Sequence, residues 1–263
     1  MNKLNLKDVT LVCIDDIYTE LSIEIIEGVT SLISFGDIKL FSSKDLNEVT
    51  HKTGPFRSSV DIESFKVGEM YKYIDTEFFL IIEYDGYPLN PSAWTDDFYK
   101  YDFIGAPWIF VRGGHNRVGC KQNKPCNKWV GNDGFSFQSS KLLIELSSRI
   151  EQFRQSPVFS ATDAWVCREI NEELKAKGFK FSPVSLASRF SVEKGVYTGQ
   201  FGWHGEAATR WRNKDWKIFN FERHAYEEGL PPLDSTIKLL DNHSDCEAMS
   251  WPGLRPVDFS EYE

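Results

Sequence analysis

Two carboxylates follow directly after the most continuously apolar segment of the chain. Residues 78–82 read FFLII, and Glu83 and Asp85 come next, two positions apart. Such a run predicts a strand buried on both faces, as in a parallel sheet. Ligands of open α/β sheets bind beyond the carboxyl ends of the strands, where two acids can hold a divalent metal ion and, through it, a diphosphate. Taken alone, Glu83-Tyr84-Asp85 more often marks the end of a strand at which the acids face solvent.

The segments around this strand predict the sheet that would position the acids. Residues 9–14 form a second buried strand, and residues 38–41 form a third, shorter one. Apolar side chains recur at helical spacing over residues 21–32 and again over residues 62–74. Alternating strands and helices predict an α/β domain with a mixed, mostly parallel central sheet flanked by helices.

The second half of the chain has a looser pattern. Residues 109–132 contain several glycines and no acidic residue, which predicts a long loop. Helices are predicted over residues 139–150 and 160–177, and a strand over residues 179–182. The proline-containing residues 226–263 are expected to form a tail packed on the domain.

Five ordered segments of the chain resemble one family of bacterial and viral glycosyltransferases, the DUF5672 domain. They are FLIIEYDGYPLNPSAWTDDFYKYDFIGAPW (residues 79–108), VGNDGFSFQSSKLL (130–143), ATDAWVCR (161–168), FKFSPVSLASRFSVE (179–193) and FGWHG (201–205). Together they extend the resemblance over residues 8–206. The sequence departs from the family pattern at two positions. One is Glu83, where related sequences often have another residue, and the other is Asp133, where the family has glycine.

The resemblance implies both a fold and an activity. It implies a single GT-A (Rossmann-like) catalytic domain over residues 1–225, with a donor half at residues 1–103 and an acceptor half at residues 104–225. The implied enzyme is a glycosyltransferase that moves a hexosyl or pentosyl group, with inversion. Its donor would be a nucleotide-diphosphate sugar, which in this architecture is most often a UDP-sugar.

A metal site is implied by the same resemblance. Glu83-Tyr84-Asp85 is similar to the Asp-x-Asp motif of GT-A enzymes, in which Asp85 would bind the Mn²⁺ or Mg²⁺ ion that neutralises the departing nucleoside diphosphate. His204 resembles the C-terminal histidine that completes the metal shell in many of these enzymes. Without the resemblance, a histidine between aromatic residues would be interpreted as a packed, hydrogen-bonded side chain.

Asp163 is the candidate general base. In inverting GT-A enzymes an acid at this helix start removes the proton of the acceptor hydroxyl, which is a poor nucleophile until it loses that proton. The string Ser160-Ala161-Thr162-Asp163 also fits a capping box, in which Asp163 would only cap its helix.

Further residues are candidates for binding the donor and the acceptor. The turn Gly131-Asn132-Asp133-Gly134 is expected beneath the sugar and acceptor, because its glycines allow close backbone approach; as an isolated string it would simply be a turn. On the donor side we expect nucleotide contacts from Asp15, Asp16, Arg57, Lys66 and Glu83. Trp203, next to His204, is a further candidate substrate contact.

The charge distribution bears on the acceptor. The net charge is −10 over residues 1–103, +8 over residues 104–225 and −7 over residues 226–263. Cations interleaved with aromatic residues can bind phosphate backbones and stack bases. The sequence leaves four acceptors open: a surface glycan, a lipid-linked sugar, a protein and a hydroxymethylated pyrimidine in duplex DNA. The basic half of the chain ranks DNA close to a glycan. The cations expected to contact DNA are Arg112, Lys121 and Arg212.

Composition limits the remaining choices. With 263 residues, 41% of them hydrophobic, the chain can bury a sizeable core and is not intrinsically disordered. No apolar run has the length of a membrane span, and the five cysteines are scattered without a secretion signal, so a cytoplasmic protein is expected. The alternatives to a transferase are a non-catalytic nucleotide-sugar or carbohydrate-binding module on the same fold, and a nucleotidyltransferase.

Overall fold

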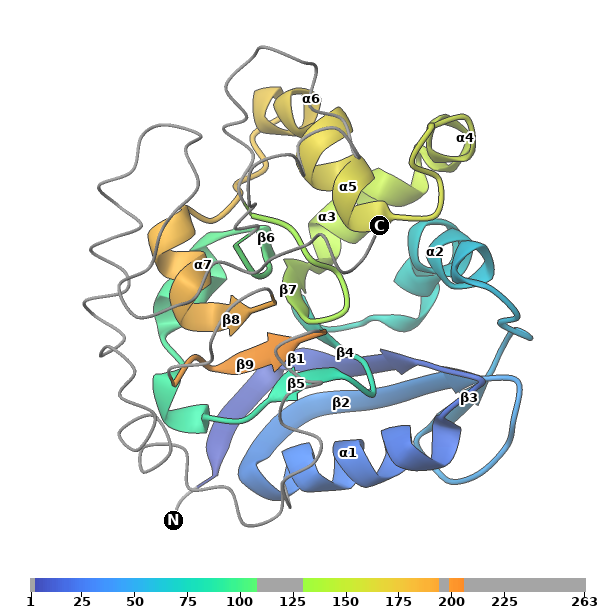
Figure 1. Cartoon of the computed structure of the whole chain (residues 1–263), viewed down its shortest axis with the longest axis vertical. Helices are drawn as coiled ribbons and strands as arrows, with labels where there is room; N and C mark the ends of the chain where they lie inside the picture. Colours follow the sequence, from blue (N-terminus) through green and yellow to red (C-terminus); the bar gives the residue numbers. More distant parts are fainter. Residues whose placement is uncertain (1–2, 108–129, 194–198, 206–263) are drawn as a thin grey trace, which may run out of the picture.

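A six-stranded sheet with the order β3-β2-β1-β4-β7-β6 forms the centre of the protein (Figure 1). The structure is a computed structural model that describes residues 3–107, 130–193 and 199–205. The strands are β1 (Leu4–Ile14), β2 (Ile33–Ser42), β3 (Thr50–Lys52), β4 (Phe78–Ile82), β6 (Phe103–Ile104) and β7 (Ser136–Ser139). Strands β3, β2, β1 and β4 are parallel, whereas β7 runs antiparallel to both β4 and β6. The predicted mixed, mostly parallel α/β sheet is therefore confirmed.

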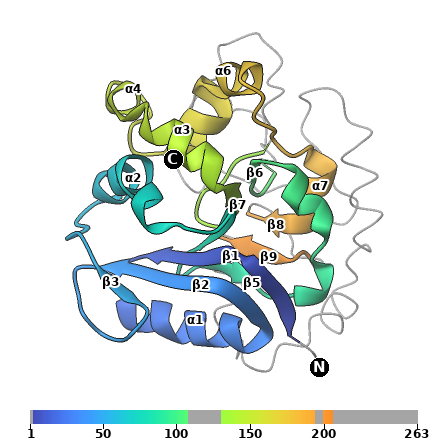
Figure 2. The same cartoon turned by 180° about the vertical axis from the view of Figure 1, so that it is seen from behind.

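Helices cover both faces of this sheet (Figures 1 and 2). Helix α1 (Thr19–Leu32) lies on one face, and α2 (Ser59–Gly68) and α3 (Ser140–Ser147) lie on the other. Side chains alternate along each strand, so Leu11 and Leu80 pack on the α1 side while Val12 and Phe79 pack on the α2 side. Both faces of β1 and β4 are thus buried, which explains their unbroken apolar runs.

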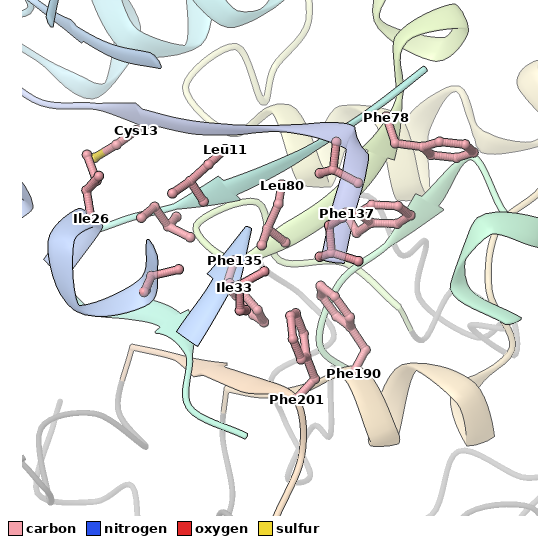
Figure 3. Close-up of a cluster of buried hydrophobic side chains, with 14 of the residues drawn as sticks. Leu11, Cys13, Ile26, Ile33, Phe78, Leu80, Phe135, Phe137, Phe190 and Phe201 are labelled. Carbon is pink, nitrogen blue, oxygen red and sulfur yellow. The ribbon is translucent and has the colours of Figure 1, made fainter. Parts of the chain in front are cut away.

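A smaller sheet with the order β5-β9-β8 adjoins the main one. Strand β5 (Gly86–Pro88) is antiparallel to β9 (Gly202–His204), which is parallel to β8 (Ser191–Val192). Helix α7 (Val184–Phe190) leads into β8. Phe135, Phe190 and Phe201 join this part to the main core; the rings of Phe135 and Phe190 stack 4.8 Å apart (Figure 3). The small sheet brings His204 to the end of β4.

The remaining helices surround a second cluster of buried side chains that includes Trp165 and Phe153. They are α4 (Ile150–Arg154), α5 (Thr162–Ala164), a π-helical turn (Trp165–Glu169) and α6 (Asn171–Ala176); short 3₁₀ helices lie elsewhere, at Met70–Tyr73, Pro91–Ala93 and Asp96–Lys100. The helix predicted over residues 160–177 is thus interrupted by the π-helical turn, and the one predicted over residues 139–150 ends at Ser147.

The strand predicted over residues 179–182 is reduced to one bridge between Phe103 and Phe181. The backbone N–H of Lys180 donates to the Asp102 carboxylate at 2.8 Å instead of to a neighbouring strand. Pro183 then directly precedes α7. Within the described ranges, no helix is both long and apolar enough to cross a membrane. Some predictions lie outside the described residues. They concern the tail of residues 226–263 and the cations expected to contact DNA, which are Arg112, Lys121 and Arg212.

Candidate active site

Glu83, Asp85 and His204 converge beyond the carboxyl end of β4. The chain turns tightly there, because Glu83 and Gly86 exchange backbone hydrogen bonds of 2.8 and 3.0 Å. The pairing of β5 with β9 sets Gly86 opposite His204. His204 Nε2 lies 3.5 Å from Glu83 Oε2 and 3.8 Å from Asp85 Oδ1, and one ligand atom from each residue lies within 4.8 Å of the others. Such a group of oxygen and nitrogen ligands is suited to a divalent cation.

The imidazole ring of His204 is held between two glycines. A Cβ atom at Gly134 would lie 2.0 Å from Nε2, and one at Gly86 would lie 2.6 Å from Cδ2. Burial disfavours the charged ring, but its hydrogen bond to Glu83 and the charges of Glu83 and Asp85 outweigh burial and raise the pKa of His204. Burial alone would raise the pKa of Glu83. The hydrogen bond from His204 and the charge of Lys66 outweigh burial and lower that pKa.

The turn Gly131-Asn132-Asp133-Gly134 lies directly beside this cluster. Asn132 has a positive φ of 66°, and its Nδ2 lies 2.7 Å from His204 Nδ1. Its Oδ1 accepts the Phe135 N–H at 3.1 Å. The structure thus brings the predicted turn together with the predicted metal ligand.

Asp133 forms a buried ion pair with Lys66. Their side chains lie 2.8 Å apart, and Lys66 Nζ also lies 2.9 Å from Glu63 Oε1. Burial would lower the pKa of Lys66, but the charges of Asp133 and Glu63 outweigh it and raise that pKa. Burial, reinforced by the charge of Asp133, raises the pKa of Glu63 to about 7 although Lys66 and Thr162 oppose the shift. Lys66 is thus enclosed by two carboxylates and is directed into the protein.

Glu63 was not predicted from the sequence, yet it determines how α5 begins. Its Oε2 accepts hydrogen bonds from both the backbone N–H and the hydroxyl of Thr162. The residue preceding α5, Ala161, provides no side-chain cap. Glu63 from α2 therefore satisfies the helix start that the capping box would have satisfied. The only sequence signal was its i, i+3 spacing from Lys66.

Asp163 is half-buried at this helix start. Its Oδ1 accepts the Ala164 N–H at 2.6 Å. Burial, together with the nearby charges of Asp133 and Glu193, raises the pKa of Asp163 to about 6. A carboxylate with a pKa close to the working pH is well matched to general-base catalysis.

Glu193 is a second acid that sequence reasoning did not single out. It follows β8 directly, and its charge acts on both Asp163 and His204. Its Oε2 is buried and has no hydrogen-bond partner among the described residues. Its position became apparent only from the pairing of β8 with β9.

The predicted donor contacts at the end of β1 have their oxygens engaged in hydrogen bonds. Asp15 accepts from the backbone N–H groups of Ile17 and Tyr18 and from Ser22 Oγ. Asp16 accepts from Ser42 Oγ and from the backbone N–H groups of Ser43 and Phe56. Although burial opposes ionisation, these hydrogen bonds lower the pKa of Asp16. Both acids therefore hold the loops that follow β1 and β2.

Aromatic side chains flank the site. Tyr18 and Tyr84 lie with their ring centroids 4.5 Å apart, and Tyr18 is 48% exposed. This pair joins the loop after β1 to the turn between Glu83 and Asp85. Trp203 is instead buried and packs edge-on against Tyr87 at 5.4 Å. Arg57 is exposed on the surface before α2.

Comparisons with known proteins place the chain in a family. Among solved structures it is similar to a glycosyltransferase involved in the glycosylation of the major capsid of PBCV-1, with 10% identity, 83% of this chain and 98% of that chain covered, and a TM-score of 0.47. It is also similar to the galactosyltransferase LgtC in complex with donor and acceptor sugar analogs, with 12% identity, coverage of 89% and 97%, and a TM-score of 0.39.

No curated protein matches the chain. Residues 46–204 match the family described as "Protein of unknown function (DUF5672)". Because this match covers more than half of the sequence, as the five ordered segments predicted, the chain belongs to the DUF5672 family.

Proposed function

We propose that this protein is a metal-dependent glycosyltransferase. It transfers a hexosyl or pentosyl group from a nucleotide-diphosphate sugar, with a UDP-sugar as the first candidate, to a hydroxyl group of an acceptor. The observation that carries the proposal is the convergence of Glu83, Asp85 and His204 at the carboxyl end of β4. This is the edge of an α/β sheet at which ligands bind.

The residues present fit a divalent cation. One ligand atom of Glu83, one of Asp85 and one of His204 lie within 4.8 Å of one another, and the negative charges of the two carboxylates favour a cation at this place. Mn²⁺ and Mg²⁺ prefer such oxygen ligands. When bound, the cation would supply positive charge against the departing diphosphate.

Asp163 serves as the general base in this proposal. The charges of Asp133 and Glu193 act on it, and Asp133 belongs to the turn that contacts His204. The charge of Asp163 is therefore coupled to residues next to the metal cluster. It would accept the proton of the acceptor hydroxyl as that oxygen attacks the sugar, which corresponds to an inverting reaction.

The donor side is formed by the loop after β1 and the turn after β4. The exposed ring of Tyr18, next to Tyr84, offers a face on which a nucleobase can stack. Asp15 and Asp16 fix the backbone of this wall, and Arg57 is free to approach a phosphate from its rim. Lys66 contributes by holding Asp133, while the missing side chain at Gly134 leaves room for the His204 ring.

A glycan hydroxyl is the acceptor that the described residues favour. Asp163 and Glu193 interact with each other and with Arg168, so these three residues offer no net positive charge to a phosphate backbone. Hydroxymethylated DNA, suggested by the basic residues 104–225, is the alternative acceptor for the same assay.

The test is a screen of nucleotide sugars with Mn²⁺ or Mg²⁺, followed by mass spectrometry with glycan and hydroxymethylated-DNA acceptors. Release of a nucleoside diphosphate and a mass gain of one sugar on the acceptor are expected. Release of pyrophosphate would instead identify a nucleotidyltransferase. Donor binding without hydrolysis or transfer for any pair would identify a non-catalytic module and overturn the proposal.

A further inference from the structure

The orientation of the Asn132 side-chain amide is fixed by one backbone group. The Phe135 N–H points to one end of this amide at 3.1 Å. A backbone N–H can only donate, so the atom that faces it must be the oxygen Oδ1. The NH₂ group of Asn132 therefore lies at the opposite end, 2.7 Å from Nδ1 of His204.

This orientation decides which ring nitrogen of His204 carries the proton. An NH₂ group has no acceptor capacity, so Nδ1 must accept from it with its lone pair. A proton on Nδ1 would set two donors against each other at 2.7 Å. The proton of the neutral ring then resides on Nε2, which faces Glu83 Oε2 at 3.5 Å and Asp85 Oδ1 at 3.8 Å.

Neither partner can readily turn around. Rotating the ring by half a turn would bring carbon atoms to both hydrogen-bonding positions. The ring is also packed against Gly134 and Gly86, where even a Cβ atom would lie within 2.0 and 2.6 Å of it. Asn132 is only 2% exposed, and turning its amide would place NH₂ against the Phe135 N–H.

We propose that Asn132 is a positioning residue that holds the proton of His204 on Nε2, so that His204 donates a hydrogen bond to anionic oxygens instead of coordinating the cation. Glu83 and Asp85 then hold the cation through oxygen alone. A nitrogen binds a metal ion only through a free lone pair, and Nε2 in this tautomer has none. The inference rests on the cation site of the proposed function and assigns its ligands.

The proposal predicts which metals the site prefers. Oxygen ligands suit Mg²⁺ and Mn²⁺, whereas imidazole nitrogen adds affinity for Zn²⁺, Co²⁺ and Ni²⁺. The wild-type site should therefore lack the extra affinity for Zn²⁺ that a coordinating histidine provides.

One substitution reverses the tautomer with little change of shape. Asn132→Asp has nearly the same volume, and aspartate tolerates the positive φ of 66° at this position. One carboxylate oxygen still accepts the Phe135 N–H, and the other accepts a proton from Nδ1. Nε2 of His204 is then left with a free lone pair that faces the two carboxylates.

Long-range ¹H–¹⁵N correlation spectra of the metal-free full chain at pH 8, with ¹⁵N-labelled histidine, read the tautomer directly. His204→Ala assigns the signals among the five histidines of the sequence. We expect a protonated Nε2 in the wild type and a protonated Nδ1 in Asn132→Asp. A protonated Nδ1 in the wild type would overturn the proposal, whether or not the variant folds.

Calorimetric titration with Mg²⁺ and Zn²⁺ tests the consequence for the metal. Asn132→Asp should raise the affinity for Zn²⁺ relative to Mg²⁺ by at least about 10-fold, the gain expected of a newly available nitrogen ligand. The double variant Asn132→Asp/His204→Ala carries the same added charge without the ring and should lose this gain. If the gain persists in the double variant, charge alone explains it and the proposal fails.

These measurements separate the inference from the proposed function. The tautomer is read without a metal, a donor or an acceptor. A protein that shows the expected tautomers but transfers no sugar would overturn the transferase and leave the role of Asn132 standing.

Discussion

Lys66 and Asp133 form an ion pair of 2.8 Å that is almost completely shielded from water. The pair joins α2 on the surface of the sheet to the turn that contacts His204. Lys66 also pairs with Glu63, which accepts the Thr162 N–H at the start of α5. One ammonium group therefore connects α2, the turn that contains Asp133 and the helix start at which Asp163 lies.

Replacing this ammonium group should strongly destabilise the fold. Lys66→Met leaves Glu63 and Asp133 buried without a counter-charge, and breaking a buried pair in this way costs about 3–5 kcal/mol. Urea denaturation followed by circular dichroism measures the loss. Lys72→Met removes a pair of the same i, i+3 spacing, Glu69–Lys72, from the surface and should cost less than about 1 kcal/mol. Similar losses for the two variants would contradict the structural role of Lys66.

Asp163→Asn should lower activity and raise stability at the same time. The base is lost, so turnover should fall by about 10²–10⁴ with little change in donor affinity. The asparagine oxygen can still accept the Ala164 N–H. Stability should rise because the pKa of Asp163 is raised from 3.8 to about 6 in the fold.

The sign of this effect follows from linkage. The folded state holds the proton of Asp163 more tightly than the unfolded chain does, so the stabilisation present below pH 4 is lost as the pH rises through about 6. The variant should therefore melt at a higher temperature than the wild type at pH 7 and at a similar temperature near pH 4. The exposed Asp75→Asn should show neither effect. A lower melting temperature with normal turnover would mean that Asp163 only stabilises its helix.

The activity of the wild type should also depend on pH. A general base must be ionised in the free enzyme, so kcat/KM should decline as the pH falls below about 6, the pKa of Asp163. A profile that is flat between pH 5 and pH 7 would count against Asp163 as the base.

Removing one cation-binding carboxylate should abolish both metal binding and transfer. Asp85→Asn retains the size of the side chain but loses the charge that attracts Mn²⁺ or Mg²⁺. Calorimetry should show no Mn²⁺ binding at this site, while circular dichroism remains that of the wild type. Asp97→Asn, on the exposed surface, is the control and should bind as the wild type does. Full activity of Asp85→Asn, or of the wild type in a chelator, would refute the metal dependence.

The Tyr18 ring should matter for the donor and little else. Stacking of a base on an aromatic ring is worth about 1–3 kcal/mol, so Tyr18→Ala should raise the KM for the donor by about 5- to 160-fold with kcat nearly unchanged. Tyr71→Ala removes another exposed tyrosine, 38% accessible, and should leave the KM unchanged. Equal effects of the two substitutions would exclude a specific stacking role.

Much of the sheet could be predicted because its signals are local. The FFLII run predicted β4 with the bounds that the structure shows, and therefore the position of Glu83 and Asp85. His204 was connected to them only through the resemblance to a family. No periodicity in the sequence indicates that a strand near residue 203 pairs with one near residue 87.

The contacts that orient the site could not be predicted, because they join distant residues. Asn132 and His204 are 72 positions apart, and Glu63 and Thr162 are 99 positions apart. Isolated from their partners, these residues suggest a turn and an ordinary surface helix. Their roles arise from how α2, the Asn132 turn and β9 pack against one another.

The pairing of β5 with β9 also determines when, during synthesis of the chain, Glu83, Asp85 and His204 can come together. Glu83 and Asp85 are synthesised well before His204, and only the addition of β9 beside β5 brings the three together. The main sheet up to β7 contains mostly earlier contacts, whereas this closure spans more than one hundred residues and carries a correspondingly larger loop-closure cost. A growing chain can therefore build its main sheet first and bring His204 to Glu83 and Asp85 last, so that a nascent chain that ends before residue 202 cannot assemble this group of three side chains.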